Sequence, residues 1–279
     1  MAGCDVTVTV TVQILYLLRT SMRAQVRRFF LAALMATWGI GLLGLLLPRL
    51  SSAIPVFSNA SPFYWLAAYA VSAIGIGMTA RYDGWPGLSR LGQRLLPWKA
   101  GLRWYAIVLG GYGALTFVAL QTARWFGAVP SPMPSMEAAL VGIALTFVLD
   151  PGPVGEEFGW RGFGLPRLLA FRSPLPASLI LGAIHTLWHV PLFFIPALAQ
   201  NAIAFPAFAI GVASIAIIDT WLYLHAGANL LLAILVHVMA NYCGGILGAD
   251  AFPFFAGAEG LAAATIVASG GLRRTRALV

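Results

Sequence analysis

The chain has 279 residues, of which 60% are hydrophobic and only 9% are charged. Soluble globular domains carry about 25% charged residues, so this composition excludes that class and indicates a polytopic membrane protein. The net charge of +8 does not indicate nucleic-acid binding, because the basic residues lie between apolar segments, where they report membrane orientation and contact with anionic lipid.

The first 28 residues read as a segment separate from the membrane domain. Residues 6–12 alternate Val and Thr, a strand-like period, and they lack the basic region and small-residue cleavage site of a signal peptide. We expect residues 1–28 to be poorly ordered or packed at the membrane interface. Met22 begins a short basic stretch that leads directly into the first apolar segment, so one hypothesis is that translation naturally starts there.

Eight apolar segments follow, and most have close to the roughly 20 residues that cross a bilayer. They are residues 29–47, 63–80, 104–123, 136–149, 175–195, 205–223, 229–247 and 254–268. The fourth is short and ends at a Pro-Gly break, so we expect the next helix to complete it. The sequence predicts an all-α fold: one membrane domain over residues 29–272 with about eight transmembrane helices, followed by a basic tail, residues 273–279.

The basic residues indicate the orientation of these spans. With eight spans both termini share one side of the membrane, and 15 of the 17 Lys and Arg residues fall on that side, leaving only Arg49 and Arg124 on the other. By the positive-inside rule we predict an integral, multi-pass membrane protein with cytoplasmic N- and C-termini and with the segment around Glu156 toward the cytoplasm.

Two adjacent carboxylates, Glu156 and Glu157, interrupt the apolar pattern after a Pro-Gly-Pro-Val-Gly run. An ionised group at the bilayer centre costs about 2.5–3.5 kcal/mol on insertion scales, so the pair indicates function. In a helix, Glu157 and Arg161 stand at i and i+4 and can form an ordinary ion pair, whereas Glu156 is rotated about 100° away and remains available for chemistry.

Two later spans carry histidines at helical spacing. His185 and His189 share one face at i and i+4, followed by Pro191, and His237 and Asn241 have the same spacing in the seventh span. An intramembrane His is often a helix-packing hydrogen bonder, but polar groups on three spans also seek each other or a water-filled cavity. We expect His225 to lie in a turn at the membrane interface. We expect Asp150 and Asp219 to lie at the ends of spans.

These motifs together resemble the CAAX-protease and bacteriocin-processing (Abi) family of intramembrane proteases. The family's Glu-Glu-x-x-x-Arg motif is matched by Glu156, Glu157 and Arg161, and its His-x-x-x-Asn motif by His237 and Asn241. Residues 188–191 match the Trp-His-x-Pro context of its second motif, but His185 stands where the family has an aromatic residue. The resemblance covers about residues 140–245.

The resemblance implies a multi-helix membrane fold with a conical catalytic cavity in which a peptide bond is hydrolysed, with a peptide or prenylated-protein C-terminus as substrate. It implies that Glu156 activates water with help from His189, and that His237 and Asn241 stabilise the oxyanion. Glu157 and Arg161 would support the site. For His185 we expect a supporting role beside it, because the family's site works with an aromatic residue at this position.

A metal is an open alternative. Glu156, His189 and His237 would also supply the ligands of a catalytic zinc with one open position. However, His185 is not followed by the Glu of the His-Glu-x-x-His zinc motif.

Two other function classes are compatible with the same residues. A catalytically silent bacteriocin-immunity or scaffold protein could share the fold, and a transporter would also place ionisable groups at depth, although no matched halves are evident.

Overall fold

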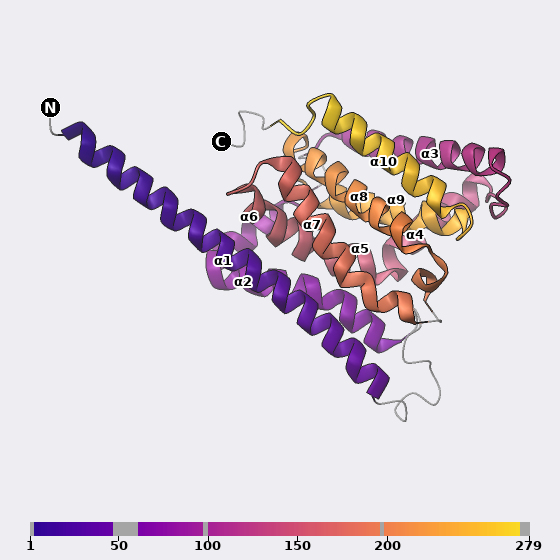
Figure 1. Ribbon diagram of the computed structural model, residues 1–279, viewed down its shortest axis with the longest axis horizontal. Coiled ribbons are helices and arrows are strands. Elements are labelled where there is room, and N and C mark those ends of the chain that lie inside the picture. The colour runs from indigo at the N-terminus through magenta and orange to yellow at the C-terminus, as the bar shows by residue number, and fades with distance from the viewer. Residues whose placement is uncertain (1–2, 47–60, 97–99, 196–197, 274–279) are drawn as a thin grey trace.

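The computed structural model describes residues 3–46, 61–96, 100–195 and 198–273, and side chains from residue 20 onward apart from residues 44–60. Helices dominate these ranges, and no strand occurs within them (Figure 1). The predicted all-α membrane bundle is confirmed. Arg49, Lys99 and all of the predicted basic tail except Arg273 lie outside the described residues.

Each of the eight predicted apolar segments lies in a helix or a helical pair. Within the described residues, six helices are long and apolar enough to cross a membrane, and a seventh span results if α4 (Met136–Leu149) and the helical segment after it, bent by 49°, are counted together. The last helix is apolar but has only 17 residues. The helices that correspond to the predicted segments are α1 (Gly3–Leu46), α2 (Pro62–Gln93), α3 (Leu102–Trp125), α4 (Met136–Leu149), α7 (Pro174–His189), α8 (Phe205–His225), α9 (Leu230–Leu247) and α10 (Phe252–Ala268).

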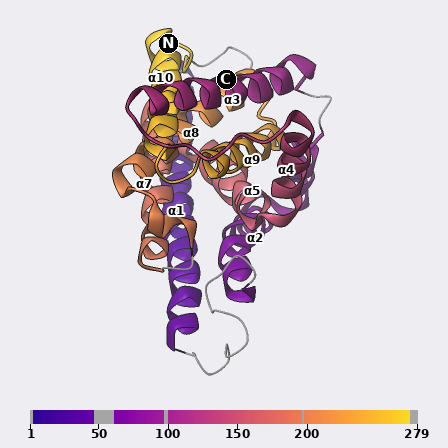
Figure 2. The ribbon, with the colours of Figure 1, turned by 90° about the vertical axis from the view of Figure 1, so that its right-hand side faces the viewer.

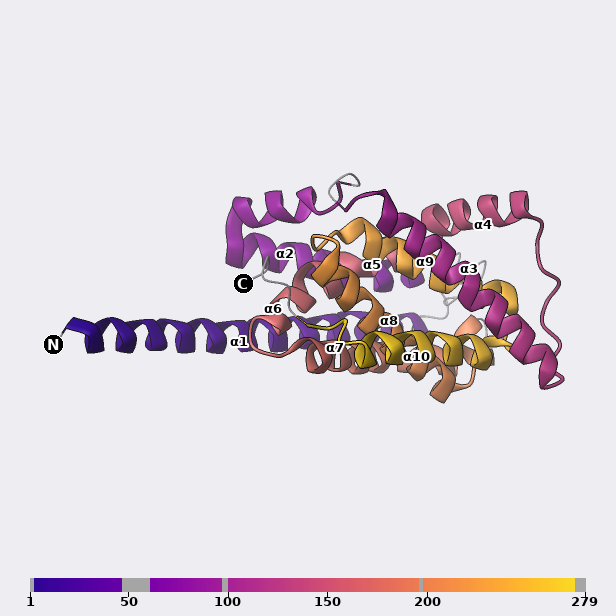
Figure 3. The same ribbon diagram turned by 90° about the horizontal axis from the view of Figure 1, so that it is seen from above.

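The N-terminal segment differs from the prediction. Helix α1 is continuous from Gly3 to Leu46, so the Val-Thr alternation of residues 6–12 forms part of a helix that is neither extended nor separate from the first span. Its N-terminal part projects beyond the bundle (Figures 1 and 3). Alternation over a few β-branched residues is a weak local preference, which helix propagation from an adjoining span overrides. The interfacial location of this segment stays a prediction.

The helices form two rows. In one row α3, α9, α5 (Pro151–Glu157) and α2 contact one another in that order, and α4 packs on α9 (Figure 2). In the other row α10, α8, α7 and α1 follow one another. The rows are joined by contacts of α8 with α9, of α10 with α3 and of α1 with α2. Segments far apart in sequence therefore meet along the seam between the rows.

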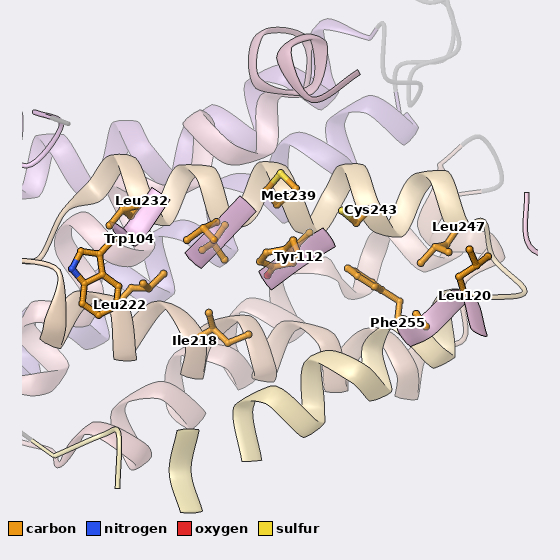
Figure 4. Packing of buried hydrophobic residues seen from close by; sticks show 14 of the residues in the cluster. Trp104, Tyr112, Leu120, Ile218, Leu222, Leu232, Met239, Cys243, Leu247 and Phe255 are labelled. Carbon is orange, nitrogen blue, oxygen red and sulfur yellow. The ribbon is translucent and has the colours of Figure 1, made fainter. Parts of the chain in front are cut away.

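Apolar side chains fill much of this seam. Figure 4 shows Tyr112 of α3 and Phe255 of α10 in one buried cluster with Met239 and Cys243 of α9 and Ile218 of α8. Burial of an aromatic or aliphatic side chain of this size contributes about 1.5–3 kcal/mol, so the cluster fixes α9 and α8 against each other.

Proline and glycine define two breaks that shape the site. Asp150 ends α4 and caps α5, because its Oδ1 accepts a hydrogen bond of 2.9 Å from Gly152 N and Pro151 occupies the first position of the new helix. In α2, Gly84 has a φ of 61°, and with Pro86 two residues later the helix turns back on itself (Figure 3). This turn brings Arg94 close to the helical segment that follows α5. There Arg94 Nη1 donates a hydrogen bond of 3.1 Å to Gly162 O.

Gly75 and Gly159 allow the backbone of α2 to pass very close to the segment that follows Glu157. This segment, η3 (Phe158–Gly164), is a π-helix and leads into α6 (Leu165–Leu169). A Cβ added to Gly75 would lie 2.6 Å from Gly159 Cα, and one added to Gly159 would lie 2.5 Å from Val71 O. No larger residue fits at either position without separating the backbones.

We therefore expect Gly75→Ala to lower the thermal stability of the purified protein, because overpacking costs about 1–3 kcal/mol. Gly77 is the matched control: it lies one half-turn further along the same helix, and a Cβ there would meet nothing within 4 Å. Gly77→Ala should be neutral or slightly stabilising through helix propensity. Thermal unfolding in detergent measures both, and equal melting temperatures for the two variants would contradict the close crossing.

Candidate active site

Five of the seven predicted site residues line one cavity of about 430 Å³, whereas Glu157 and Arg161 lie outside its lining. Its wall includes residues of both helix rows, so it lies in the seam between them. The lining includes Glu156, His185, His189, His237 and Asn241, which the sequence places on three separate spans. Tertiary structure thus brings all three motifs together.

The cavity opens at one end of the bundle. Its exposed lining residues include Ala202, which precedes α8, and Gly245 and Ala249, which flank the end of α9. This is the end at which α7 and α9 finish and α8 and α10 begin. At the opposite end, Arg28 of α1 donates to Tyr82 of α2 and other basic side chains gather.

Glu156 is held by two donors on one of its oxygens. His185 Nε2 lies 2.7 Å from Glu156 Oε2, and Trp160 Nε1, one helical turn along, donates to the same atom at 3.1 Å. Because a carboxylate only accepts, His185 carries its proton on Nε2 in this arrangement. The carboxyl group is buried, yet its other oxygen, Oε1, is directed toward the cavity beside Gly152.

Glu157 belongs to a buried ion-pair network. Arg161 Nη1 donates to Glu157 Oε1 at 2.8 Å, as the spacing predicts, and Arg161 Nε lies 2.9 Å from Asp219 Oδ2 on α8. Glu157 is 0%, Arg161 1% and Asp219 2% exposed. The guanidinium therefore neutralises two carboxylates from two different helix rows, which is the condition under which buried charges persist.

The same glutamate orients the histidine of the third motif. His237 Nδ1 lies 2.8 Å from Glu157 Oε1, so Nδ1 donates and Nε2 is left facing the cavity. The neighbouring carboxylate also offsets a positive charge on the ring, which lets Nε2 act as a donor when the imidazole is protonated. Glu157 is thus the link between Arg161 and His237.

His189 is oriented by its own helix. Its Nδ1 bonds His185 O at 3.0 Å, and its ring packs edge-on against Trp188 and Phe208. The helix ends at His189 and continues as a 3-10 turn, Val190–Phe194, because Pro191 cannot continue the α-helical hydrogen bonding. The Nε2 atom is consequently the ring nitrogen left for the cavity.

Gly152 keeps open the space between these groups. A Cβ added to it would lie 3.2 Å from His237 Nε2, 3.2 Å from Asp150 Oδ1 and 3.3 Å from Glu156 Oε1. Three polar atoms thus surround one point that only hydrogen occupies. Asn241 joins them, because its Nδ2 donates to Asp150 Oδ2 at 2.8 Å.

The comparison with known proteins agrees with this arrangement. Residues 136–243 match the family model described as "Type II CAAX prenyl endopeptidase Rce1-like". The matched segment agrees with the family predicted from the three motifs. The matched range starts with α4 and includes all three motifs of this Rce1-like segment.

A curated relative supports the same assignment. The chain is 30% identical over 105 residues to the "CAAX prenyl protease 2" of Methanococcus maripaludis. The similarity covers 36% of this chain and 39% of that protein, so it spans less than half the length of either.

The predicted position of Asp219 is wrong, that of Asp150 at a span end is confirmed, and Glu259 was not predicted as a cavity residue. Asp219 was expected at a span end but lies buried in α8 against Arg161, and Asp150 caps α5 and also faces the cavity. Glu259 of α10 is buried at 1% exposure and lines the same cavity. An acidic residue in the middle of an apolar segment was the available signal for Asp219 and Glu259, since burial of a carboxylate there is costly.

Metal-ligand chemistry is available in the cavity. Among the described residues, Glu156, His185 and His189 offer ligand atoms that all lie within 4.8 Å of one another. This set contains His185, whereas the predicted set contained His237, whose Nδ1 is bonded to Glu157. Two imidazoles and one carboxylate are the donor types of a catalytic zinc site. The chemistry fits zinc, although Glu156 Oε2 and His185 Nε2 bond each other in this arrangement.

We expect Arg161→Ala to reduce the amount of folded protein, because it leaves Glu157 and Asp219 buried without their cation. Removal of one partner of a buried ion pair costs about 3–5 kcal/mol. Size-exclusion chromatography of the solubilised protein measures the folded fraction, with Arg90→Ala at an exposed position of α2 as the control. Full folded yield of Arg161→Ala would show that the network does not stabilise the fold.

Proposed function

We propose that this protein is an intramembrane endopeptidase of the CAAX-prenyl-protease-like type, which hydrolyses a peptide bond with water activated by Glu156. The observation that carries the proposal is the single cavity in which Glu156 Oε1 and His237 Nε2 face the same small space beside Gly152. A buried carboxylate and an imidazole at such a point suit general acid–base chemistry on a bound water.

The proposed reaction uses the polar atoms that face the cavity. Glu156 takes a proton from water, the water oxygen attacks the peptide carbonyl carbon, and the tetrahedral intermediate carries its negative charge on the former carbonyl oxygen. Protonated His237 donates to that oxygen through Nε2, and Asn241 donates through the Nδ2 hydrogen that is not bonded to Asp150. Each such donor contributes about 2.7–4 kcal/mol in a preorganised site. The proton then passes to the leaving nitrogen as the C–N bond breaks.

The supporting residues have distinct proposed roles. His185 and Trp160 hold Glu156 Oε2, so that Oε1 is the oxygen presented to water. His189 presents Nε2 to the cavity and assists the proton transfer. A zinc ion held by Glu156, His189 and a second histidine would supply Lewis-acid chemistry and lower the pKa of a bound water to about 7.

The proposed substrate is a peptide that reaches the site within the membrane. The name of the methanococcal relative indicates a prenylated C-terminus for that protein. In this chain the cavity is lined by Phe208, Phe252 and Phe255 as well as by its polar groups, which suits a peptide with an apolar chain or side chain.

A silent immunity or scaffold protein is the competing function, and Glu156→Gln separates the two. The substitution keeps the shape of the side chain but removes the base, so we expect cleavage to fall by about two to four orders of magnitude while expression persists. Comparative proteomics of membranes that contain either form would reveal uncleaved substrates. Glu137→Gln, at an exposed position of α4, is the matched control. An unchanged proteome and phenotype would favour the scaffold.

For the histidines we expect unequal losses. His185→Phe should retain most activity, because Trp160 still holds Glu156 Oε2, whereas His189→Ala and His237→Ala should each lose at least about two orders of magnitude. The measurement is turnover of a peptide substrate, together with the metal content of each purified variant. If folded His185→Phe is as inactive as His189→Ala and both lose a bound metal, a metal-dependent mechanism replaces the glutamate-only one.

We also propose that the cavity opens away from the cytoplasm. The basic residues concentrate at the end of the bundle that carries Arg28, Arg90 and Arg167, and the cavity mouth lies at the other end. By the positive-inside rule both termini are cytoplasmic, and peptides at the opposite membrane surface reach the site most directly.

Single-cysteine labelling tests this orientation. In a background without Cys4 and Cys243, Arg90→Cys should react only from the cytoplasmic side, and Ala202→Cys, at the cavity mouth, only from the opposite side. Labelling of both from one side would contradict the topology. Labelling of Ala202→Cys from the cytoplasm alone would reverse the orientation and favour cytoplasmic prenylated substrates.

A further inference from the structure

A second hollow, which we call the α1–α7 groove, lies on the other side of α7 from the catalytic cavity. It has a volume of about 450 Å³ and is lined by α1, α7 and the end of α6. Its lining includes three arginines, Arg23, Arg27 and Arg172, and apolar residues such as Phe30, Leu34 and Ile184. None of these residues lines the catalytic cavity.

The groove has a charged end and an apolar end. Along α1 the lining changes from Arg23 and Arg27 to Leu31 and Leu34. On the opposite wall it changes from Arg172, just before α7, to Ile180 and Ile184 within α7. Both walls therefore become apolar in the same direction. From residue 23 to residue 34 a helix rises about 16 Å, roughly half of the hydrocarbon thickness, so the groove is as long as one leaflet.

The guanidinium groups are placed over the charged end. Arg23 lies 5.5 Å and Arg172 5.9 Å from the ring centre of Phe171, which itself lines the groove. Arg23 and Arg27 are exposed, and neither forms an ion pair with another residue in the described part of the chain. Asp83, a carboxylate at this end of the bundle, is bound by Arg167 at 2.7 Å. Arg23 and Arg27 thus present positive charge without an ion-pair partner among the described residues.

We propose that the α1–α7 groove binds an anionic phospholipid, with one acyl chain along the apolar end and the phosphate-bearing headgroup against Arg23, Arg27 and Arg172. Both flanking helices are apolar enough to span a membrane, and Leu31 at the apolar end is 52% exposed, so this end of the groove is open to lipid. Arginine forks match phosphate oxygens, and a net negative headgroup complements three cations better than a zwitterionic one does. The occupant is therefore an anionic lipid of the leaflet at the basic end.

Occupancy of this groove should stabilise the helix that carries the histidines. Phe30 of α1 and Leu168 of α6 line the groove and belong to the same packed cluster as Trp160 and Trp188. Those two tryptophans contact His185 on their other side. A lipid seated between α1 and α7 consequently adds contacts to the wall behind the catalytic cavity. This inference does not rest on the proposed peptidase activity.

The test is native mass spectrometry of the full-length protein released from nanodiscs that contain equal amounts of phosphatidylglycerol and phosphatidylcholine. We expect the wild type to retain phosphatidylglycerol preferentially and the triple variant Arg23→Gln/Arg27→Gln/Arg172→Gln to retain at least about tenfold less. The control is Arg81→Gln/Arg90→Gln/Arg103→Gln, which removes the same charge from exposed positions outside the groove. This control should retain the lipid as the wild type does.

A second variant keeps the test decisive if the triple variant folds poorly. Leu31→Trp retains every charge but places a bulky ring at an exposed position of the apolar end, where it should also displace the lipid. Added phosphatidylglycerol should raise the melting temperature of the wild type but not that of Leu31→Trp. Equal retention of the two lipids by the wild type, or equal loss in the groove and control triple variants, would overturn the proposal. So would displacement of the lipid by inorganic phosphate alone.

Discussion

Arg161 holds the two helix rows together through charge. Its guanidinium pairs with Glu157 on α5 and with Asp219 on α8, and all three side chains are buried. In a membrane interior, no water is available to replace a lost partner, so these groups must find one another for the bundle to form. Through Glu157 the same interaction sets the ring of His237. The geometry of the site therefore depends on an ion pair that does not itself face the cavity.

Glu157 and Glu156 differ in their surroundings: the first lies in the buried ion-pair network and the second faces the cavity. Glu157 Oε1 is bound by Arg161 and by His237 and serves the structure, whereas Glu156 keeps one oxygen toward the cavity. The glycines around them make this division possible. Gly152 leaves space between Glu156 Oε1 and His237 Nε2, and Gly159 lets α2 approach the π-helix that carries Arg161. Such π-helical segments occur frequently at functional sites because they change which face a side chain presents.

Opposite ends of the bundle present different surfaces. The cavity opens where α7 and α9 end, while the arginines and the α1–α7 groove lie where α7 begins. Helix α7 separates the cavity from the groove, with His185 and His189 on one face and Ile180 and Ile184 on the other. An amphipathic division of one helix thus accounts both for the proposed catalytic role and for the proposed lipid contact.

The sequence by itself determined the class, the helices and the motif residues. Apolar segments of bilayer length can form only helices in a membrane, and the i, i+4 spacing alone predicted the pair of Glu157 with Arg161. Local spacing cannot reveal partners on distant helices. The bond of His185 to Glu156, that of His237 to Glu157 and the pairing of Asp219 with Arg161 were decided only by the tertiary structure. The location of Glu259 in the cavity wall and the direction of the cavity mouth were also decided by the tertiary structure, because both depend on how the helix rows pack across the seam.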